Sequence, residues 1–126
     1  MSLCGSGTKG SACVDTINNA VGLFNDGLKT LVAQLNKNII DATFIFINSA
    51  GISSSTSSLD VPCCKVSSIT GICIPVEKPC SNRSQYLFWD AFHPTEILYE
   101  LYAGRGYKAE SPSDAHPSDI SHLAQI

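Results

Sequence analysis

The fold class is indicated most directly by the stretch Ala42-Thr-Phe-Ile-Phe-Ile-Asn48. Its apolar, partly β-branched residues follow one another without polar alternation, which is typical of a strand covered on both faces, as in a parallel sheet between helices. On its N-terminal side, apolar residues recur every three or four positions from Val14 to Leu35. This spacing predicts a long amphipathic helix with one buried face, and the two elements together predict an α/β protein.

Length and composition narrow the class of protein further. The chain has 126 residues, enough for one domain and too few for two. Its 44% hydrophobic and 15% charged residues are typical of a soluble, packed protein and argue against a disordered or membrane-spanning one. The formal net charge of −3 is spread over both halves, so no nucleic-acid partner is expected. A lone parallel strand has no hydrogen-bonding partner, so the sequence is expected to be part of a larger fold.

Two segments after the predicted strand show little periodicity. Ser49 to Ser58 contains six serines and a threonine and predicts a loop. Leu59 to Ser84 contains four of the six cysteines and predicts an irregular, disulfide-linked excursion. So many cysteines favour an oxidising compartment, although a cytosolic chain with reduced cysteines is the alternative. Because Met1 to Gly10 does not read as a signal peptide, we expect the later part of a secreted protein whose leader is not included.

Zinc binding is the alternative role for four cysteines, with His93 as a further ligand; they are Cys63, Cys64, Cys73 and Cys80. Adjacent cysteines followed by gaps of eight and six residues lack the C-x2-C knuckle that a tetrahedral site prefers, so disulfides are favoured and no metal or cofactor is expected. Asn82-Arg83-Ser84 is the only N-glycosylation sequon and weakly supports an extracellular origin.

The sharpest candidate site lies in Tyr86-Leu-Phe-Trp-Asp90-Ala-Phe-His93-Pro-Thr-Glu96. Asp90 and His93 are three residues apart in a turn, and Pro94 is expected at the first position of the helix that follows. A neutral imidazole accepts a proton from a hydroxyl nucleophile only if its other ring nitrogen is held in the correct tautomer, which a carboxylate does. The competing interpretation is an aspartate that caps the following helix and a histidine packed under Trp89, and the spacing alone does not decide.

The tail beyond Gly104 and Gly106 is turn-rich and is expected to lie along the surface. It contains the two remaining histidines, His116 and His122. We assign neither of them a carboxylate at a comparable spacing and interpret both as surface side chains.

The longer string around Asp90 strongly resembles the last block of the plant GDSL esterase/lipases, which are members of the SGNH hydrolase superfamily. The likeness continues in the family's own order over roughly residues 10–126. The other matching stretches are Cys13–Ala20, Phe24-Asn25, Phe44–Asn48, Cys63-Cys64, Pro79–Arg83, Ser111–Ala115 and Asp119–Gln125. By this resemblance, residues 1–126 form a partial hydrolase domain, the C-terminal half of one.

The resemblance implies a three-layer α/β/α fold, of which this chain would carry an incomplete sheet. It also implies a secreted enzyme that hydrolyses carboxylic esters of small molecules or lipids through a Ser-His-Asp triad, with His93 as general base and Asp90 as its orienting partner. The family's nucleophilic serine lies in a Gly-Asp-Ser motif, and its oxyanion donors also come from earlier blocks. Neither Gly-Asp-Ser nor G-x-S-x-G occurs in this sequence. We therefore expect family identity without activity in isolation.

Two departures from the family pattern qualify that likeness. The segment from Ser53 to Cys64 is shorter and more serine-rich than usual, and Glu96-Ile-Leu-Tyr99 puts bulk where the family has small residues. Two other functions stay open. One is a disulfide-linked secreted module that binds through aromatic and serine-rich surfaces without catalysis, and the other is a truncated gene product without function.

Overall fold

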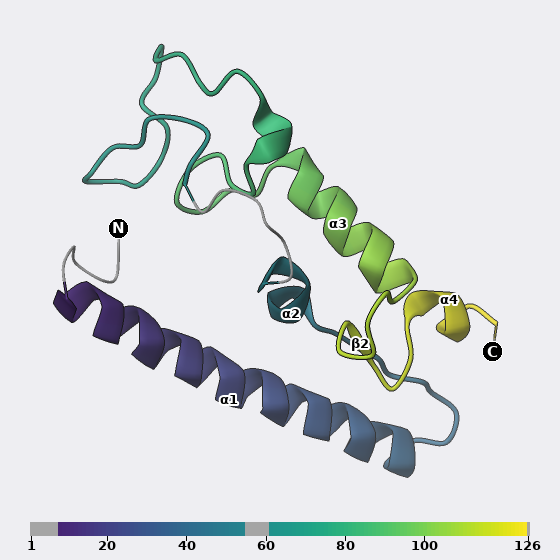
Figure 1. Ribbon diagram of the computed structural model, residues 1–126. Coiled ribbons are helices and arrows are strands. Elements are labelled where there is room, and N and C mark those ends of the chain that lie inside the picture. Colours follow the sequence, from purple (N-terminus) through teal and green to yellow (C-terminus); the bar gives the residue numbers. More distant parts are fainter. Residues whose placement is uncertain (1–7, 55–60, 126) are drawn as a thin grey trace.

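The computed structural model describes residues 8–54 and 61–125 (Figure 1). It mixes helices with a small two-stranded sheet, as expected for an α/β protein. Figure 1 shows the cysteine-rich segment near the N-terminal end of α3, and β2 and α4 near its C-terminal end. The elements in chain order are α1 (Thr8–Asn38), β1 (Phe46–Ile47), α2 (Ser49–Ser54), the 3-10 turn η1 (Arg83–Gln85), α3 (Glu96–Tyr107), β2 (Ala115–His116) and α4 (Ile120–Leu123).

Helix α1 confirms the predicted helical periodicity and extends beyond it at both ends. The prediction that its apolar face is buried is wrong for this chain, because Val21 is 44% exposed, Phe24 64% and Leu31 46%. A helix of 31 residues is about 45 Å long, far longer than the two-residue strand β1 that it contacts. The sheet therefore covers only a small part of the apolar stripe. No described helix is both long and apolar enough to cross a membrane.

Strand β1 is shorter than predicted and is paired differently. Phe46 and Ile47 pair in antiparallel register with His116 and Ala115 of β2. The predicted strand is confirmed for these two residues. The prediction of a parallel-sheet strand covered on both faces by helices is wrong for this chain, because the pairing is antiparallel and both residues of β1 are only half-buried. The partner comes from the tail, and the connection from β1 to β2 includes α2 and α3. Such a long-range pairing is not indicated by the local residue pattern of β1.

The predicted serine-rich loop is helical over the part that the structure describes. Ser49–Ser54 forms α2, and residues 55–58 lie outside the described residues. The Asn48 side chain accepts a hydrogen bond from the Gly51 amide at 3.0 Å, and Ile52 is fully buried. Side-chain capping and the burial of one apolar residue thus outweigh the low helix propensity of serine.

Helix α3 begins later and ends later than the sequence suggests. Its N-cap is Thr95, so Pro94 precedes the cap instead of occupying the first helical position. The helix continues through both glycines to Tyr107, and a Cβ at Gly106 would lie 3.4 Å from the Ile47 side chain. Gly106 therefore lies within van der Waals reach of the Ile47 side chain of β1, and the helix continues past both glycines where turns were expected.

A buried ion pair anchors the tail to α3. Asp114 is fully buried and accepts hydrogen bonds from Arg105 Nε at 2.9 Å and Nη2 at 2.6 Å. The amides of Glu110 and Ser111 donate to the same carboxylate. The Asp114 carboxylate therefore connects α3, the loop after it and the residues just before β2. The tail is held by these buried contacts and does not simply lie along the surface, as the sequence suggested.

Replacing Asp114 with asparagine is expected to destabilise the chain by about 3 kcal/mol, because it removes the buried counter-charge of the Arg105 guanidinium and leaves only the largely exposed Glu110 carboxylate, 3.8 Å away. The Arg105 hydrogen bonds hold the pKa of the Asp114 carboxyl below its usual range. Such a carboxylate stabilises the folded state above about pH 4, and this contribution is lost as pH falls through the folded-state pKa. Thermal unfolding between pH 7 and pH 2 should show a lower Tm and a weaker acid dependence for Asp114→Asn. Identical curves would contradict this role.

Candidate active site

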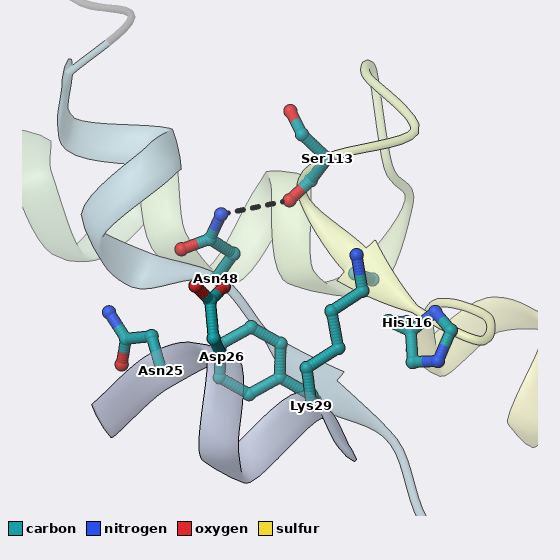
Figure 2. Close-up of a pocket in the computed structure, with 8 residues that line it drawn as sticks. Asn25, Asp26, Lys29, Asn48, Ser113 and His116 are labelled. Carbon is teal, nitrogen blue, oxygen red and sulfur yellow. Dashed lines mark hydrogen bonds between the residues drawn. The ribbon is translucent and has the colours of Figure 1, made fainter. Parts of the chain in front are cut away.

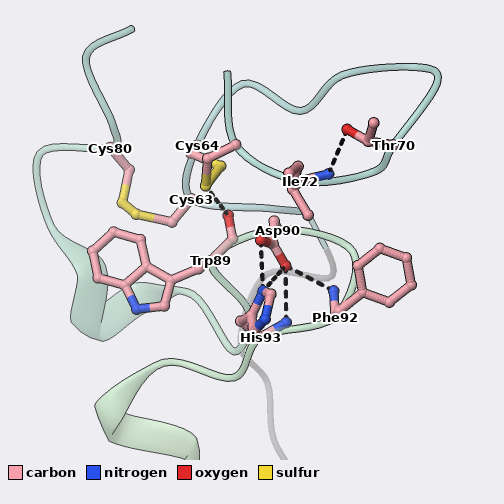
Figure 3. The surroundings of a disulfide bond; sticks show 10 residues. Cys63, Cys64, Thr70, Ile72, Cys80, Trp89, Asp90, Phe92 and His93 are labelled. Atoms are coloured by element: carbon pink, nitrogen blue, oxygen red, sulfur yellow. Dashed lines mark hydrogen bonds and ion pairs between the residues drawn. A yellow bond between two sulfur atoms is a disulfide. The ribbon is translucent and has the colours of Figure 1, made fainter. Parts of the chain in front are cut away.

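Two disulfides shape the segment beside the candidate site (Figure 3). They join Cys63 to Cys80 and Cys64 to Cys73. All cysteines in the described part of the chain are disulfide-bonded. The predicted disulfide-linked segment is confirmed, and the zinc alternative is excluded for these four cysteines because each thiolate that would bind the metal is consumed in a bridge.

Asp90 and His93 face each other across a tight turn, as their spacing predicts (Figure 3). His93 Nδ1 lies 2.7 Å from Asp90 Oδ2 and 2.9 Å from Oδ1. The amides of Phe92 and His93 both donate to Asp90 Oδ1 at 2.8 Å. Since α3 begins at Glu96, Asp90 does not cap that helix, and its hydrogen bonds stay within its own turn.

The two side chains of the pair differ sharply in exposure. The side chain of Asp90 is 6% exposed and that of His93 is 67% exposed. The interpretation that His93 is packed under Trp89 is therefore wrong. With Nδ1 engaged by a buried carboxylate and most of the ring in solvent, Nε2 is the ring nitrogen that can accept a proton from an approaching hydroxyl.

The electrostatics of Asp90 suit an orienting carboxylate. Burial by itself raises the pKa of the Asp90 carboxyl, but hydrogen bonds from the His93 ring and from the His93 and Phe92 amides outweigh burial and hold the pKa below its usual range. Asp90 therefore remains ionised at neutral pH. An ionised partner favours the imidazole tautomer with its proton on Nδ1 and stabilises the imidazolium when it forms.

A cavity of about 200 Å³ adjoins the buried carboxylate. Its lining is apolar apart from Asp90 and consists of Val61, Pro62, Phe88, Asp90 and Ala91. A largely apolar pocket next to a few polar groups is the usual form of a small-molecule site. The cavity therefore offers space beside Asp90 for an apolar part of a ligand.

A second aspartate-histidine pair, which sequence reasoning missed, has a ring contact of the same length, but the His122 ring contacts one carboxylate oxygen where the His93 ring contacts both. His122 Nδ1 lies 2.7 Å from Asp119 Oδ1, the His122 amide donates to that oxygen at 3.0 Å, and the His122 side chain is 69% exposed. The expectation that His122 lacks a carboxylate at comparable spacing is wrong, and the same D-x-x-H spacing was the available signal. Hydrogen bonds from the Ala109 amide, the His122 ring and the Ser121 hydroxyl hold the pKa of Asp119 well below its usual range.

The two pairs nevertheless have different surroundings. Asp119 is the N-cap of α4 and also binds the Ala109 amide, so its carboxylate has a structural task. A cavity of about 300 Å³ is lined by both Asp119 and His122, together with two prolines and two serines, whereas His93 does not line the cavity beside Asp90. Geometry alone therefore does not identify a catalytic base, because an aspartate that caps a short helix produces the same contacts.

The remaining histidine belongs to another cavity (Figure 2). His116 is half-buried in β2, not fully on the surface as expected, and lines a polar space of about 110 Å³ with Asp26 and Lys29 of α1. Asn48 donates to the Ser113 carbonyl at 3.0 Å across this space. Both signs of charge meet here, but His116 itself has no carboxylate at bonding distance among the described contacts.

Comparison with known proteins adds a family relationship to this geometry. The GDSL esterase/lipase At1g29670 of Arabidopsis thaliana is 44% identical to this chain over 93% of the chain's length. Two further proteins of the same plant are also similar. GDSL esterase/lipase At1g29660 is 39% identical over 93% of the chain, and the protein named GDSL esterase/lipase 7 is 33% identical over 96% of the chain. The chain is a relative of the plant GDSL esterase/lipases.

This relationship confirms the family resemblance of the sequence and connects the chain to a family of hydrolases. The chain spans only 35% of the length of the first two GDSL esterase/lipases and 36% of the third. No family model matches the chain, and no solved structure matches it. The catalytic roles of Asp90 and His93 stay predictions that the contacts above make specific.

Proposed function

We propose that this chain is the C-terminal portion of a GDSL-type serine esterase/lipase, with His93 as general base and Asp90 as its orienting carboxylate. The observation that carries the proposal is an exposed imidazole held through Nδ1, at 2.7 Å, by a buried carboxylate in a relative of these hydrolases. Its substrate class is a carboxylic ester, either a small molecule or a lipid, and the apolar cavity beside Asp90 suits the hydrocarbon part of such an ester.

The proposed chemistry assigns one proton-transfer role to this chain. His93 Nε2 removes the proton from a serine hydroxyl as that oxygen attacks the ester carbonyl, and then returns the proton to the departing alcohol. Asp90 stabilises the imidazolium between these two steps. Water repeats the sequence on the acyl-enzyme, and His93 again accepts and returns a proton. The serine and the oxyanion donors would come from a portion with the Gly-Asp-Ser motif, which is absent from these 126 residues.

The exposed apolar stripe of α1 bears on the fold of the whole protein. We infer that residues 1–126 are one partial domain of a three-layer α/β/α hydrolase, in which the remaining portion covers the apolar stripe of α1. Exposure of Val21, Phe24 and Leu31 supports this inference, since a contiguous apolar stripe is normally buried. The disulfides support a secreted enzyme, because such bridges persist in oxidising compartments.

The 126-residue chain alone is expected not to hydrolyse a short-chain aryl ester above background. A chimera, in which the portion of GDSL esterase/lipase At1g29670 not matched by this chain precedes it, is expected to be active because it unites base and nucleophile. The measurement is steady-state hydrolysis of the aryl ester. The matched control is the same chimera with its Gly-Asp-Ser serine replaced by alanine.

Two outcomes would contradict this proposal. Turnover by the chain alone that disappears in His93→Ala would mean that one of its own serines is the nucleophile. A folded chimera without activity would favour a disulfide-linked binding module instead of a hydrolase portion.

A further inference from the structure

The loop closed by the Cys64–Cys73 disulfide holds the chain on both sides of Asp90. The Cys64 amide donates to the Trp89 carbonyl at 3.0 Å, and the Ala91 amide donates to the Gly71 carbonyl at 3.0 Å. The residues just before and just after the carboxylate are therefore both hydrogen-bonded to the same loop.

The disulfide makes these two attachments a single unit (Figure 3). It joins Cys64, which holds Trp89, to Cys73 at the other end of the loop, and Val66 forms an antiparallel bridge to Cys73. Cys73 Sγ also lies 3.8 Å from the Trp89 carbonyl oxygen. This is a packing contact, because a disulfide sulfur carries no proton to donate.

Gly71 provides the carbonyl that accepts the hydrogen bond from the Ala91 amide. Its φ of 74° lies in the left-handed region, which glycine adopts without the cost that a β-branched residue would incur. The Gly71 amide donates to the Ser67 carbonyl at 2.8 Å, which closes the turn, and the Gly71 carbonyl accepts from Ala91. The backbone conformation at Gly71 is thus coupled to the position of Ala91.

The other disulfide and the other aspartate-histidine pair provide contrasts. The Cys63 amide donates to the carbonyl of Phe88, which lies two residues before Asp90. Neither Cys63 nor Cys80 has a described hydrogen bond to the residues that follow Asp90. Asp119 sits at the N-cap of α4, whereas the turn of Asp90 and His93 precedes α3 without belonging to it. This turn is closed at its base by the Trp89 amide, which donates to the His93 carbonyl at 2.8 Å, and by the Phe88–Pro94 bridge. The loop adds the tertiary contacts on either side of Asp90 that hold the rest of its backbone.

We propose that the Cys64–Cys73 loop is a positioning device for the proton-accepting pair, which fixes Trp89 and Ala91 so that the Asp90 carboxylate meets His93 Nδ1. Its residues act through the backbone and need not touch a substrate. The catalytic meaning of this device rests on the proposed function, but the geometric claim does not.

The test uses the full 126-residue chain and solution NMR. In Cys64→Ala/Cys73→Ala, hydrogen exchange of the Phe92 and His93 amides is expected to accelerate about tenfold or more as the turn opens locally. The pKa of the Asp90 carboxyl, followed by its carbon shift, is expected to rise from its lowered value. The internal reference is the Asp119–His122 pair, which should keep its exchange rates and its low carboxyl pKa. The matched control is Cys63→Ala/Cys80→Ala, in which both pairs should stay unchanged.

A second set of variants keeps both disulfides. Gly71→Val, strained at positive φ, is expected to displace the carbonyl that holds Ala91 and to loosen the pair, whereas Gly71→Asn, which tolerates this conformation, should preserve it. This set decides the question if the double-cysteine variant does not fold.

Two results would overturn the positioning role. One is an unchanged Asp90–His93 pair in Gly71→Val. The other is equal loosening of the Asp119–His122 pair, which would make the loop a general stabiliser of the fold. Neither readout involves ester hydrolysis, so a failure of the proposed function and a failure of this inference are distinguishable.

Discussion

Replacing His93 with alanine in the chimera is expected to lower turnover on the order of a million-fold, the loss typical of removing the base from such a triad. The physical reason is that no other group can take the serine proton at that position. The exposed ring, held by Asp90 through Nδ1, is the acceptor that the geometry offers. The measurement is kcat for a short-chain aryl ester at saturating concentration.

His122→Ala is the matched control for this prediction. It removes an imidazole with the same 2.7 Å contact to an aspartate and nearly the same exposure. Turnover of the chimera should change by less than about threefold, since the exposed ring can be removed at little cost to folding. If His122→Ala abolished activity and His93→Ala did not, the assignment of the base would be reversed.

Replacing Asp90 with asparagine in the chimera is expected to lower kcat roughly ten-thousand-fold with little change in KM. Oδ1 of the new amide still accepts from the Phe92 and His93 amides, while its NH2 group replaces the oxygen that faces Nδ1. An N–H donor there stabilises the tautomer with its proton on Nε2, which cannot accept the proton of serine. Steady-state kinetics and the nitrogen shifts of His93 measure the two consequences.

Asp119→Asn serves as the corresponding control. It makes the same chemical change at an N-cap, so it should lower the Tm while kcat stays within a few-fold of the unchanged chimera. An Asp90→Asn chimera with full turnover, or one in which only KM changes, would show that the carboxylate does not orient the base.

The sequence predicted what depends on neighbours along the chain. The spacing from Val14 to Leu35 predicted α1 because helical periodicity is a local property. The spacing of Asp90 and His93 predicted their pairing, since a single turn suffices to bring them together. The same reasoning applied to Asp119 and His122 would have found the second pair.

Longer motifs contributed a different kind of information. The string from Tyr86 to Glu96 indicated the hydrolase family, which the plant relatives confirm. It did not reveal that an equivalent aspartate-histidine pair occurs elsewhere in the chain. Only the surroundings of each carboxylate, a turn before α3 for Asp90 and the N-cap of α4 for Asp119, distinguish the two.

By itself, then, the sequence determined the long helix, the disulfide-linked segment, the local pairing of Asp90 with His93 and the hydrolase kinship. Only the tertiary structure decided the antiparallel partner of β1, the cysteine pairing, the burial of Asp114 against Arg105 and the exposure of the α1 stripe. The physical reason is that a residue pattern records which face is apolar or which group can donate. Burial and pairing depend on which segments, distant in the sequence, pack against that face or bond to that group.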